Sequence, residues 1–268
     1  MLTTARGVVG AVLLIVVLAG AFLGPLLAPH AIDEPVGIPG SAPGGGTVLG
    51  TDFLGRDVLS RFLHGGSPLI LVTLAALALT YSVGITVGIY TALATKRVDG
   101  LILRSVDLLL TFPPLLVLLV LVAGAGRGAT VLVVGISLVL IPGVVRVVRT
   151  MALEVAHKGY VEAALARGES TVAILRREVL PNIVPGLVAD AGARMLGAIF
   201  LSASMSFLGL AAAPPAANWA LMIAENRTVL ATNVWSVLAP ACAIAALTVS
   251  VNLLGDACVH TRSSSKGR

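Results

Sequence analysis

Long stretches without any charged residue constrain this chain more than any other feature of its sequence. Only 12% of its 268 residues are charged and 57% are hydrophobic, whereas an ordinary soluble domain carries about 25% charged residues. So few charges could not cover so apolar a core in water, and the gaps between them match the roughly 20 apolar residues that a bilayer span needs. The composition therefore predicts a membrane protein and excludes a soluble enzyme, a nucleic-acid binder and a disordered chain.

The charge-poor runs predict an all-α fold with six membrane-spanning helices. They cover Gly7–Leu27, Gly65–Thr95, Leu108–Gly126, Gly128–Val145, Ile183–Leu210 and Thr228–Gly255, the last span beginning near Val234. The first run is longer than the apolar core of a typical signal peptide, which has about 7–15 residues. We therefore expect an uncleaved first span, with a cleaved signal peptide as the alternative.

The basic residues are divided unequally between the segments that join these runs. With both ends of the chain inside the cell, 13 of the 18 Lys and Arg residues fall on the inner side and four on the outer side. Because cytoplasmic loops carry the excess of Lys and Arg, both termini are expected in the cytoplasm. The expected organisation is a first span with its outer loop over residues 1–67, followed by a membrane core over residues 68–268.

The outer loop between the first two spans is rich in Pro and Gly in its first half, which predicts irregular structure. It ends in the sequence GTDFLGRDVLSR, residues 50–61, in which Asp57 can cap a helix. A short helix over Val58–Leu63 could lie on the membrane surface through its apolar side. The alternative is a solvated turn that leads directly into the second span, and physical chemistry alone favours it.

The inner loop, residues 150–182, joins the fourth and fifth spans and has the pattern of two short amphipathic helices. Residues spaced four apart share one face of the first helix: Glu154, Lys158 and Glu162. Gly168 is expected to end that helix. Ser170 can cap a second helix over residues 171–179, which Pro181 is expected to stop. The loop is either an interfacial connector or a knob that inserts into a partner protein, where the small Ala163 and Ala164 would allow a close approach.

The chain lacks the motifs of an energy source of its own. It has no GxxxxGK[ST] phosphate loop and no catalytic motif of the common hydrolases, and its histidines are isolated, without metal-ligand spacing. Inside the fifth run, Asp190 and Arg194 lie four residues apart and are expected to pair, which lowers the cost of charge in the bilayer. The sequence thus predicts a conduit that is not an enzyme and that receives its energy from a partner, with the inner loop as the docking element.

Several motifs then resemble one family. The sequence YVEAALARG at residues 160–168, followed by VLPN at 179–182, resembles the EAA loop of binding-protein-dependent ABC importer permeases. Residues 50–61 resemble the segment before the second span in the C-type permease of dipeptide, oligopeptide and nickel importers. SFLGL at 206–210, Pro214, Pro215 and Trp219, and NLLGD at 252–256 resemble the same subgroup. The motifs occur in the family's order and span most of the chain.

The resemblance implies a permease subunit that forms half of a translocation pathway for peptides in the bacterial plasma membrane. Its implied partners are a second permease in a heterodimer, two cytoplasmic ATPase subunits that carry ATP and Mg, and an extracytoplasmic solute-binding protein. The implied ATPase contact comprises Glu162, Ala163, Ala164, Gly168, Leu180 and Pro181. The extracytoplasmic motif comprises Gly50, Thr51, Asp52, Gly55, Arg56 and Asp57. Polar candidates inside the spans are Asp190, Arg194, Ser202, Asn252 and Asp256.

The substrate stays open at the level of the sequence. Ser202 stands where an acidic residue is common in the family, which leaves the substrate class open. Nickel or another small solute is the alternative to peptides, because importers of those solutes share the same motifs. A function of a different class is a stand-alone secondary transporter, in which Asp190 and Arg194 would form the coupling site. A membrane scaffold without transport is the third alternative.

Overall fold

The computed structural model describes residues 5–156, 158–211 and 216–265, and in these ranges every regular element is a helix. The elements are α1 (Ala5–Leu23), a 3₁₀ turn (Gly24–Leu27), α2 (Val58–Leu93), α3 (Lys96–Thr111), α4 (Pro114–Ala125), α5 (Ala129–Ala156), α6 (Gly159–Ala166), α7 (Thr171–Ile174), a π-helical turn (Leu175–Val179), α8 (Leu180–Phe207), α9 (Trp219–Asn226) and α10 (Trp235–Ser265). Five described helices are long and apolar enough to cross a membrane, or six spans are present if the bent pair α3–α4 counts as one. The predicted all-α polytopic fold is therefore confirmed.

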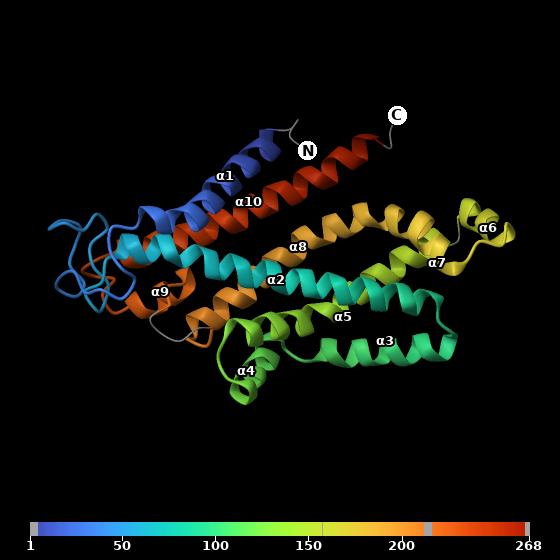
Figure 1. The fold of residues 1–268 in the computed structure, drawn as a ribbon, viewed down its shortest axis with the longest axis horizontal. Coiled ribbons are helices and arrows are strands. Elements are labelled where there is room, and N and C mark those ends of the chain that lie inside the picture. Colours follow the sequence, from blue (N-terminus) through green and yellow to red (C-terminus); the bar gives the residue numbers. More distant parts are fainter. Residues whose placement is uncertain (1–4, 157, 212–215, 266–268) are drawn as a thin grey trace.

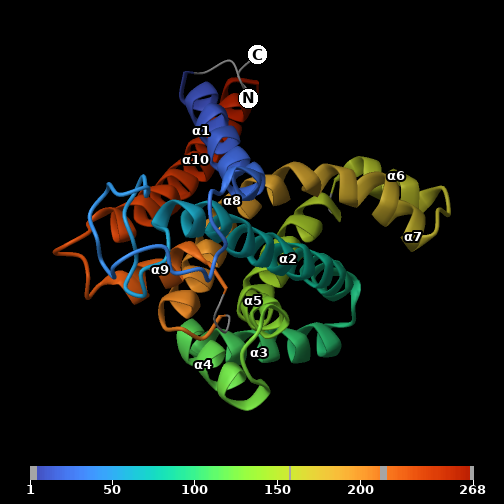
Figure 2. The same cartoon turned by 60° about the vertical axis from the view of Figure 1, so that its left-hand side comes forward.

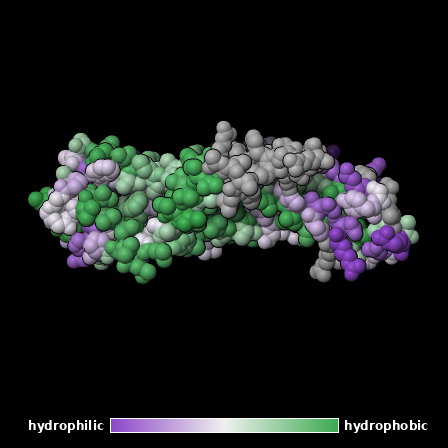
Figure 3. Space-filling model, turned by 90° about the horizontal axis from the view of Figure 1, so that it is seen from above, coloured by the Kyte–Doolittle hydropathy of each residue, from purple (hydrophilic) through white to green (hydrophobic). Residues whose placement is uncertain are grey.

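The elements outside the bundle gather at its two opposite ends (Figure 1). The outer loop, α9 and the segment before α10 lie at one end, whereas α6, α7 and the junction between α2 and α3 lie at the other. Both termini of the described chain point towards the end that carries α6. A hydrophobic band lies between hydrophilic ends on the face seen in Figure 3, as the predicted membrane arrangement requires.

Among the described helices, α2 and α5 have the most extensive contact with each other. A Cβ added at Gly84 would lie 2.5 Å from Val144 Cγ1, and one added at Gly88 would lie 2.7 Å from Val148 Cβ. This GxxxG spacing lets helix backbones approach closely, which is how helices associate without a hydrophobic driving force. The Ser137 hydroxyl adds a hydrogen bond to the Ala76 carbonyl on α2, 2.9 Å away.

The predicted third span is not one straight helix. The expected run Leu108–Gly126 is divided between α3 and α4, which are bent by 88° relative to each other. Phe112 and Pro113 between them have extended backbones, with ψ of 133° and 125°. The reason is local, because Pro disfavours a helical conformation in the residue before it, and here two prolines follow one another.

The start of α2 decides between the two interpretations of residues 58–63. The helix runs without interruption from Val58 into the second span, so a separate surface helix is wrong and direct entry into the span is confirmed. The turn before the helix is not solvated as expected, because Thr51, Asp52 and Asp57 are buried. The Asp57 side chain accepts a hydrogen bond from the Ser60 amide at 2.9 Å, as a helix cap does. The expected boundary at residues 67 and 68 falls inside this helix, and the proposed two-part division of the chain stays a prediction.

Candidate functional site

The inner loop is folded as a helical hairpin. Gly168 has φ of +77°, the left-handed conformation that ends α6, and the Ser170 hydroxyl accepts from the Ala173 amide at 3.3 Å. The predicted glycine end and serine cap are therefore confirmed. Two details of the prediction are wrong. The helix that contains Glu154 ends at Ala156 before α6 begins, so Glu154 does not share a helix with Glu162, and Pro181 starts α8 instead of stopping the second helix.

The apolar side of the hairpin packs against the spans that precede and follow it, α5 and α8. Val161, Ala164 and Ile174 are buried in one cluster with residues of the flanking helices: Val144, Val148, Ala152, Val179, Ile183 and Leu187. Ala164 has no exposed surface within this chain, and Leu180 packs at the margin of the cluster. A partner can therefore reach the hairpin only on its other side.

That other side carries the exposed residues of the turn. Arg167 and Gly168 are exposed, and the Arg167 guanidinium pairs with Glu169 at 2.7 Å. Pro181 is exposed as well. The side chains of Glu162 and Ala163 lie outside the described residues. The structure thus gathers the described members of the predicted ATPase contact at one end of the bundle, with Ala164 inside and the turn outside.

A polar node joins three spans in the middle of the bundle. Arg194 Nε donates to Asp190 Oδ2 at 2.7 Å, so the predicted pairing is confirmed. Tyr81 on α2 donates to the same carboxylate oxygen at 2.5 Å. On α5, Gly143 leaves room for the guanidinium, since a Cβ there would lie 2.6 Å from Arg194 Nη1. Tyr81 was not predicted, because a contact between residues 109 positions apart leaves no local pattern in the sequence.

Two of the remaining in-span candidates, Ser202 and Asn252, do not join this node. Ser202 is buried in α8, Asn252 is exposed on α10, and the side chain of Asp256 lies outside the described residues. Two further ion pairs connect α3 to α5. Arg149 holds Asp99 with two hydrogen bonds of 2.7 and 2.6 Å, and Arg146 pairs with Asp107.

The predicted extracytoplasmic motif takes part in a buried ion network. Asp52 has no exposed side-chain surface, and it accepts from the amides of Leu54 and Arg56 and from Arg56 Nε. The side chain of Arg61, 1% exposed, pairs with Asp52 at 3.4 Å and with Glu225 of α9 at 2.8 Å. Removing charges from water is costly unless they are paired and hydrogen-bonded, and here each is paired.

Two glycines of the motif allow its loop to close tightly. Gly50 has φ of +73° and Gly55 has φ of +81°. A Cβ at Gly50 would lie 2.2 Å from the Ser41 carbonyl oxygen, and one at Gly55 would lie 2.3 Å from the Gly37 carbonyl oxygen. No other residue fits these positions without moving backbone.

Side chains from α9 and the segment after it hold the loop in place. Asn226 accepts from the Phe53 amide at 3.0 Å, and Asn233 donates to the carbonyls of Leu49 and Thr51. Trp219 stacks on Phe62 and donates to its carbonyl at 2.8 Å. We call this assembly of residues 28–66 with 218–233 the outer cap. Trp219 was among the predicted motif residues, whereas α9 and Glu225 were not predicted, because eight residues between two long apolar runs carry little pattern.

Glu225 is the carboxylic acid of the outer cap whose pKa is shifted. Burial raises the pKa of Glu225 above its usual value, against the lowering effect of the Arg61 and Arg56 charges. Desolvation disfavours the charged carboxylate, and it outweighs the attraction of the two guanidinium groups here.

Comparisons with known proteins agree with this architecture. Residues 84–261 match the family described as binding-protein-dependent transport system inner membrane component. The chain is 35% identical to a peptide permease protein of Brucella abortus over 92% of this chain and 83% of that protein. It is 34% identical to a di/tripeptide transport system permease of Pseudomonas aeruginosa, over 78% of this chain and 69% of that one.

A solved structure shows the same fold. A chain of the MetNI methionine ABC transporter, in an inward-facing conformation, aligns with a TM-score of 0.62 at 19% identity, covering 75% of this chain and 95% of that chain. The family match extends over more than half of the chain and includes the hairpin, the Asp190–Arg194 pair and α9. This multi-pass membrane protein therefore belongs to the inner membrane components of binding-protein-dependent transport systems.

Proposed function

We propose that the chain is the permease subunit of an ABC importer in a bacterial inner membrane, where it forms half of a translocation pathway for di- and oligopeptides. The hairpin α6–α7 faces the cytoplasm and receives the movement of an ATPase subunit. A second permease, a second ATPase subunit and an extracytoplasmic solute-binding protein complete the complex, and ATP and Mg bind to the ATPases. The observation that carries the proposal is the hairpin, which packs against the flanking helices α5 and α8 and leaves its turn exposed.

Peptides are proposed as the substrate because of the relatives. The Brucella and Pseudomonas proteins are named as peptide and di/tripeptide permeases, and a third, from Escherichia coli, is named as a D,D-dipeptide permease at 32% identity over 93% of this chain. The outer cap is proposed as the surface that the binding protein contacts, because it lies at the end of the bundle opposite to α6 (Figure 1).

Uptake by the complete complex tests the substrate. The chain would be reconstituted with its partner subunits and binding protein in liposomes, and uptake of a labelled dipeptide would be measured with and without ATP. We expect uptake only with ATP and with the binding protein. Uptake by this chain alone without ATP would instead support a secondary transporter. ATP-driven uptake of nickel without uptake of peptides would show that nickel, and not a peptide, is the substrate.

A substitution in the turn tests the coupling. Gly168→Asp adds a charged side chain at an exposed position of the turn, so we expect it to abolish co-purification of the ATPase. Gly126→Asp is the matched control, because Gly126 also has a positive φ, of +87°, also has open space around it, and lies at the opposite end of α5. Equal ATPase recovery with both variants would overturn the proposed docking site.

A further inference from the structure

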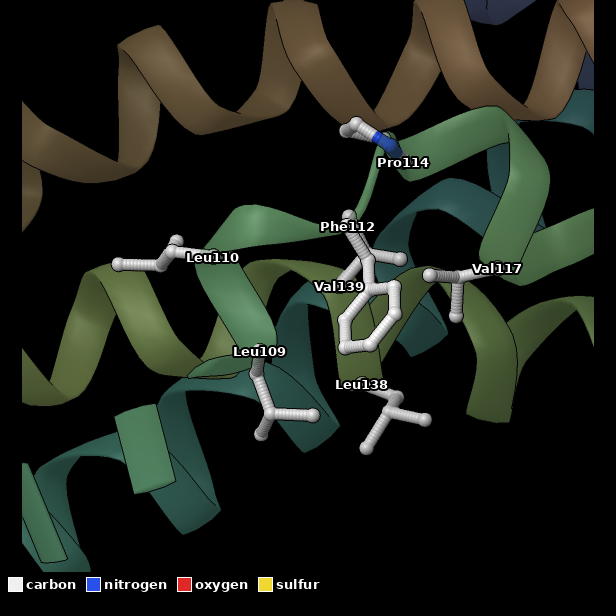
Figure 4. A pocket seen from close by; sticks show the side chains of 7 residues that line it. All are labelled: Leu109, Leu110, Phe112, Pro114, Val117, Leu138 and Val139. Carbon is white, nitrogen blue, oxygen red and sulfur yellow. The ribbon is translucent and has the colours of Figure 1, made fainter. Parts of the chain in front are cut away.

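The break between α3 and α4 lies at membrane depth. Leu138 and Val139 of α5 border it (Figure 4), and Leu138 lies about 14 Å along α5 from its first residue at 1.5 Å per residue. The charged Arg127 precedes that helix, so the break lies close to the middle of a hydrocarbon core of about 30 Å. The side chain of Phe112 in the break is 59% exposed, and Pro113 and Pro114 are exposed as well.

The sequence of the break leaves a backbone acceptor without a helical partner. The Leu110 carbonyl would receive its helical hydrogen bond from the residue three or four positions later, and both are prolines, which have no N–H. The hydroxyl of Thr111 already donates to the Leu108 carbonyl at 2.6 Å. Such an acceptor is costly in hydrocarbon, and irregular backbone occurs at this depth only where it is buried in protein or lines a water-filled cavity.

Water is the better donor for this carbonyl. A neighbouring transmembrane helix uses its own amides internally and can offer only side-chain donors. Beside the break lies a hollow of about 70 Å³ lined by apolar side chains, among them those of Leu109, Phe112 and Leu138. It is large enough for a few water molecules, which would need backbone groups of the break as their polar partners.

An exposed ion pair continues the same face towards the inner side. Asp107 and Arg146 are paired, yet their side chains are 58% and 53% exposed. Arg146 follows Leu138 and Val139 by eight and seven residues, so the three lie on one side of α5. Arg146 is about 26 Å along α5, still within the depth of the core, where charged groups face a bundle interior or water and not lipid.

We propose that the face formed by the α3–α4 break and the Asp107–Arg146 pair lines the water-filled translocation pathway of the assembled complex. This inference rests on the proposed function, and it assigns the pathway side of the subunit. The opposite face, on which α1 lies (Figure 2), then meets lipid.

Thiol accessibility tests the assignment in membranes that contain the whole complex. Cys242, which is exposed, and Cys258 would first be replaced by Ala. Phe112→Cys is compared with Val16→Cys on α1, whose wild-type side chain is equally exposed, at 61%. The reagent is a membrane-impermeant sulfonated methanethiosulfonate, which reacts with thiolates that form in water. Thr111→Cys serves as a second site if Phe112→Cys assembles poorly.

We expect modification of the break position to be at least tenfold faster than that of Val16→Cys, in the resting or in the vanadate-trapped complex. Equally slow modification at Phe112→Cys and Thr111→Cys in both states would overturn the proposal, and so would reaction with a lipid-soluble maleimide alone. Labelling reports water and not the solute, so a complex that carries a solute other than peptides would still show the expected difference.

Discussion

Individual side chains in the outer cap illustrate how far a charge can be removed from water when its neighbours compensate. Asp52 is fully buried but receives three hydrogen bonds and two guanidinium partners. Breaking a buried pair by removing one partner leaves the other charge uncompensated. At this scale, the contribution of each ion pair to the stability of the outer cap depends on how deeply the pair is buried.

Arg56→Ala should therefore destabilise the protein by about 3–5 kcal/mol, seen as a lower thermal midpoint of the detergent-solubilised complex. The matched control is Arg167→Ala, which breaks an ion pair of similar length whose arginine side chain is 60% exposed. An exposed pair contributes about 0–1 kcal/mol. Similar losses in the two variants would contradict the role of burial.

Glu225 should give the outer cap a pH dependence with a definite sign. Because its pKa is higher in the folded chain than the ordinary value of 4.5, folding favours its protonated form. Its contribution to stability is fully present below the ordinary pKa and falls as the pH rises through the raised one. The wild type should therefore gain stability relative to Glu225→Gln between pH 7 and pH 4, measured as the difference of their thermal midpoints. A difference that does not change, or that changes in the other direction, would contradict the raised pKa.

At the scale of elements, the spans were predictable and their irregularities were not. A long apolar run indicates a membrane span, because the thickness of the bilayer sets the length of the run. The prolines at 113 and 114 were visible, but the run of apolar residues continued across them and suggested one straight helix. The Asp190–Arg194 pair follows from helix geometry alone, whereas Tyr81 and Glu225 meet their partners through tertiary packing, which one sequence does not encode locally.

The contact between α2 and α5 predicts a contrast between two glycines. Gly88→Ala should destabilise the protein by about 1–3 kcal/mol, because a Cβ there would lie 2.7 Å from Val148 Cβ and 2.9 Å from the Val145 carbonyl. Gly197→Ala in α8 meets nothing within 4 Å and should be neutral or gain up to about 1 kcal/mol in helix propensity. Thermal midpoints of the two variants measure the contrast, and a Gly88→Ala midpoint at or above that of the wild type would refute close packing.

At the scale of the whole molecule, the arrangement of the ends agrees with the predicted orientation. The N-terminal end of α1 and the C-terminal end of α10 point to the side of the hairpin (Figure 1). Green fluorescent protein fused to either terminus should therefore fluoresce in cells, since it folds in the cytoplasm. Alkaline phosphatase inserted at Gly45 of the outer loop should be active. Active phosphatase at a terminus would reverse the orientation.

The outer cap also has a consequence for the order in which the protein is made. Its first half is complete by residue 66, but the side chains that hold it come from Glu225, Asn226 and Asn233, which lie 164 to 184 residues further along the chain. The loop therefore leaves the ribosome long before the residues that hold it in place. The loop can close only after the fifth span has crossed the bilayer. A chain cut after residue 211 should insert its early spans yet leave residues 28–57 open to protease from outside, while the full-length chain resists. We therefore expect the folding of this protein to finish at the outer cap, once the fifth span has brought α9 and the segment after it to the first loop.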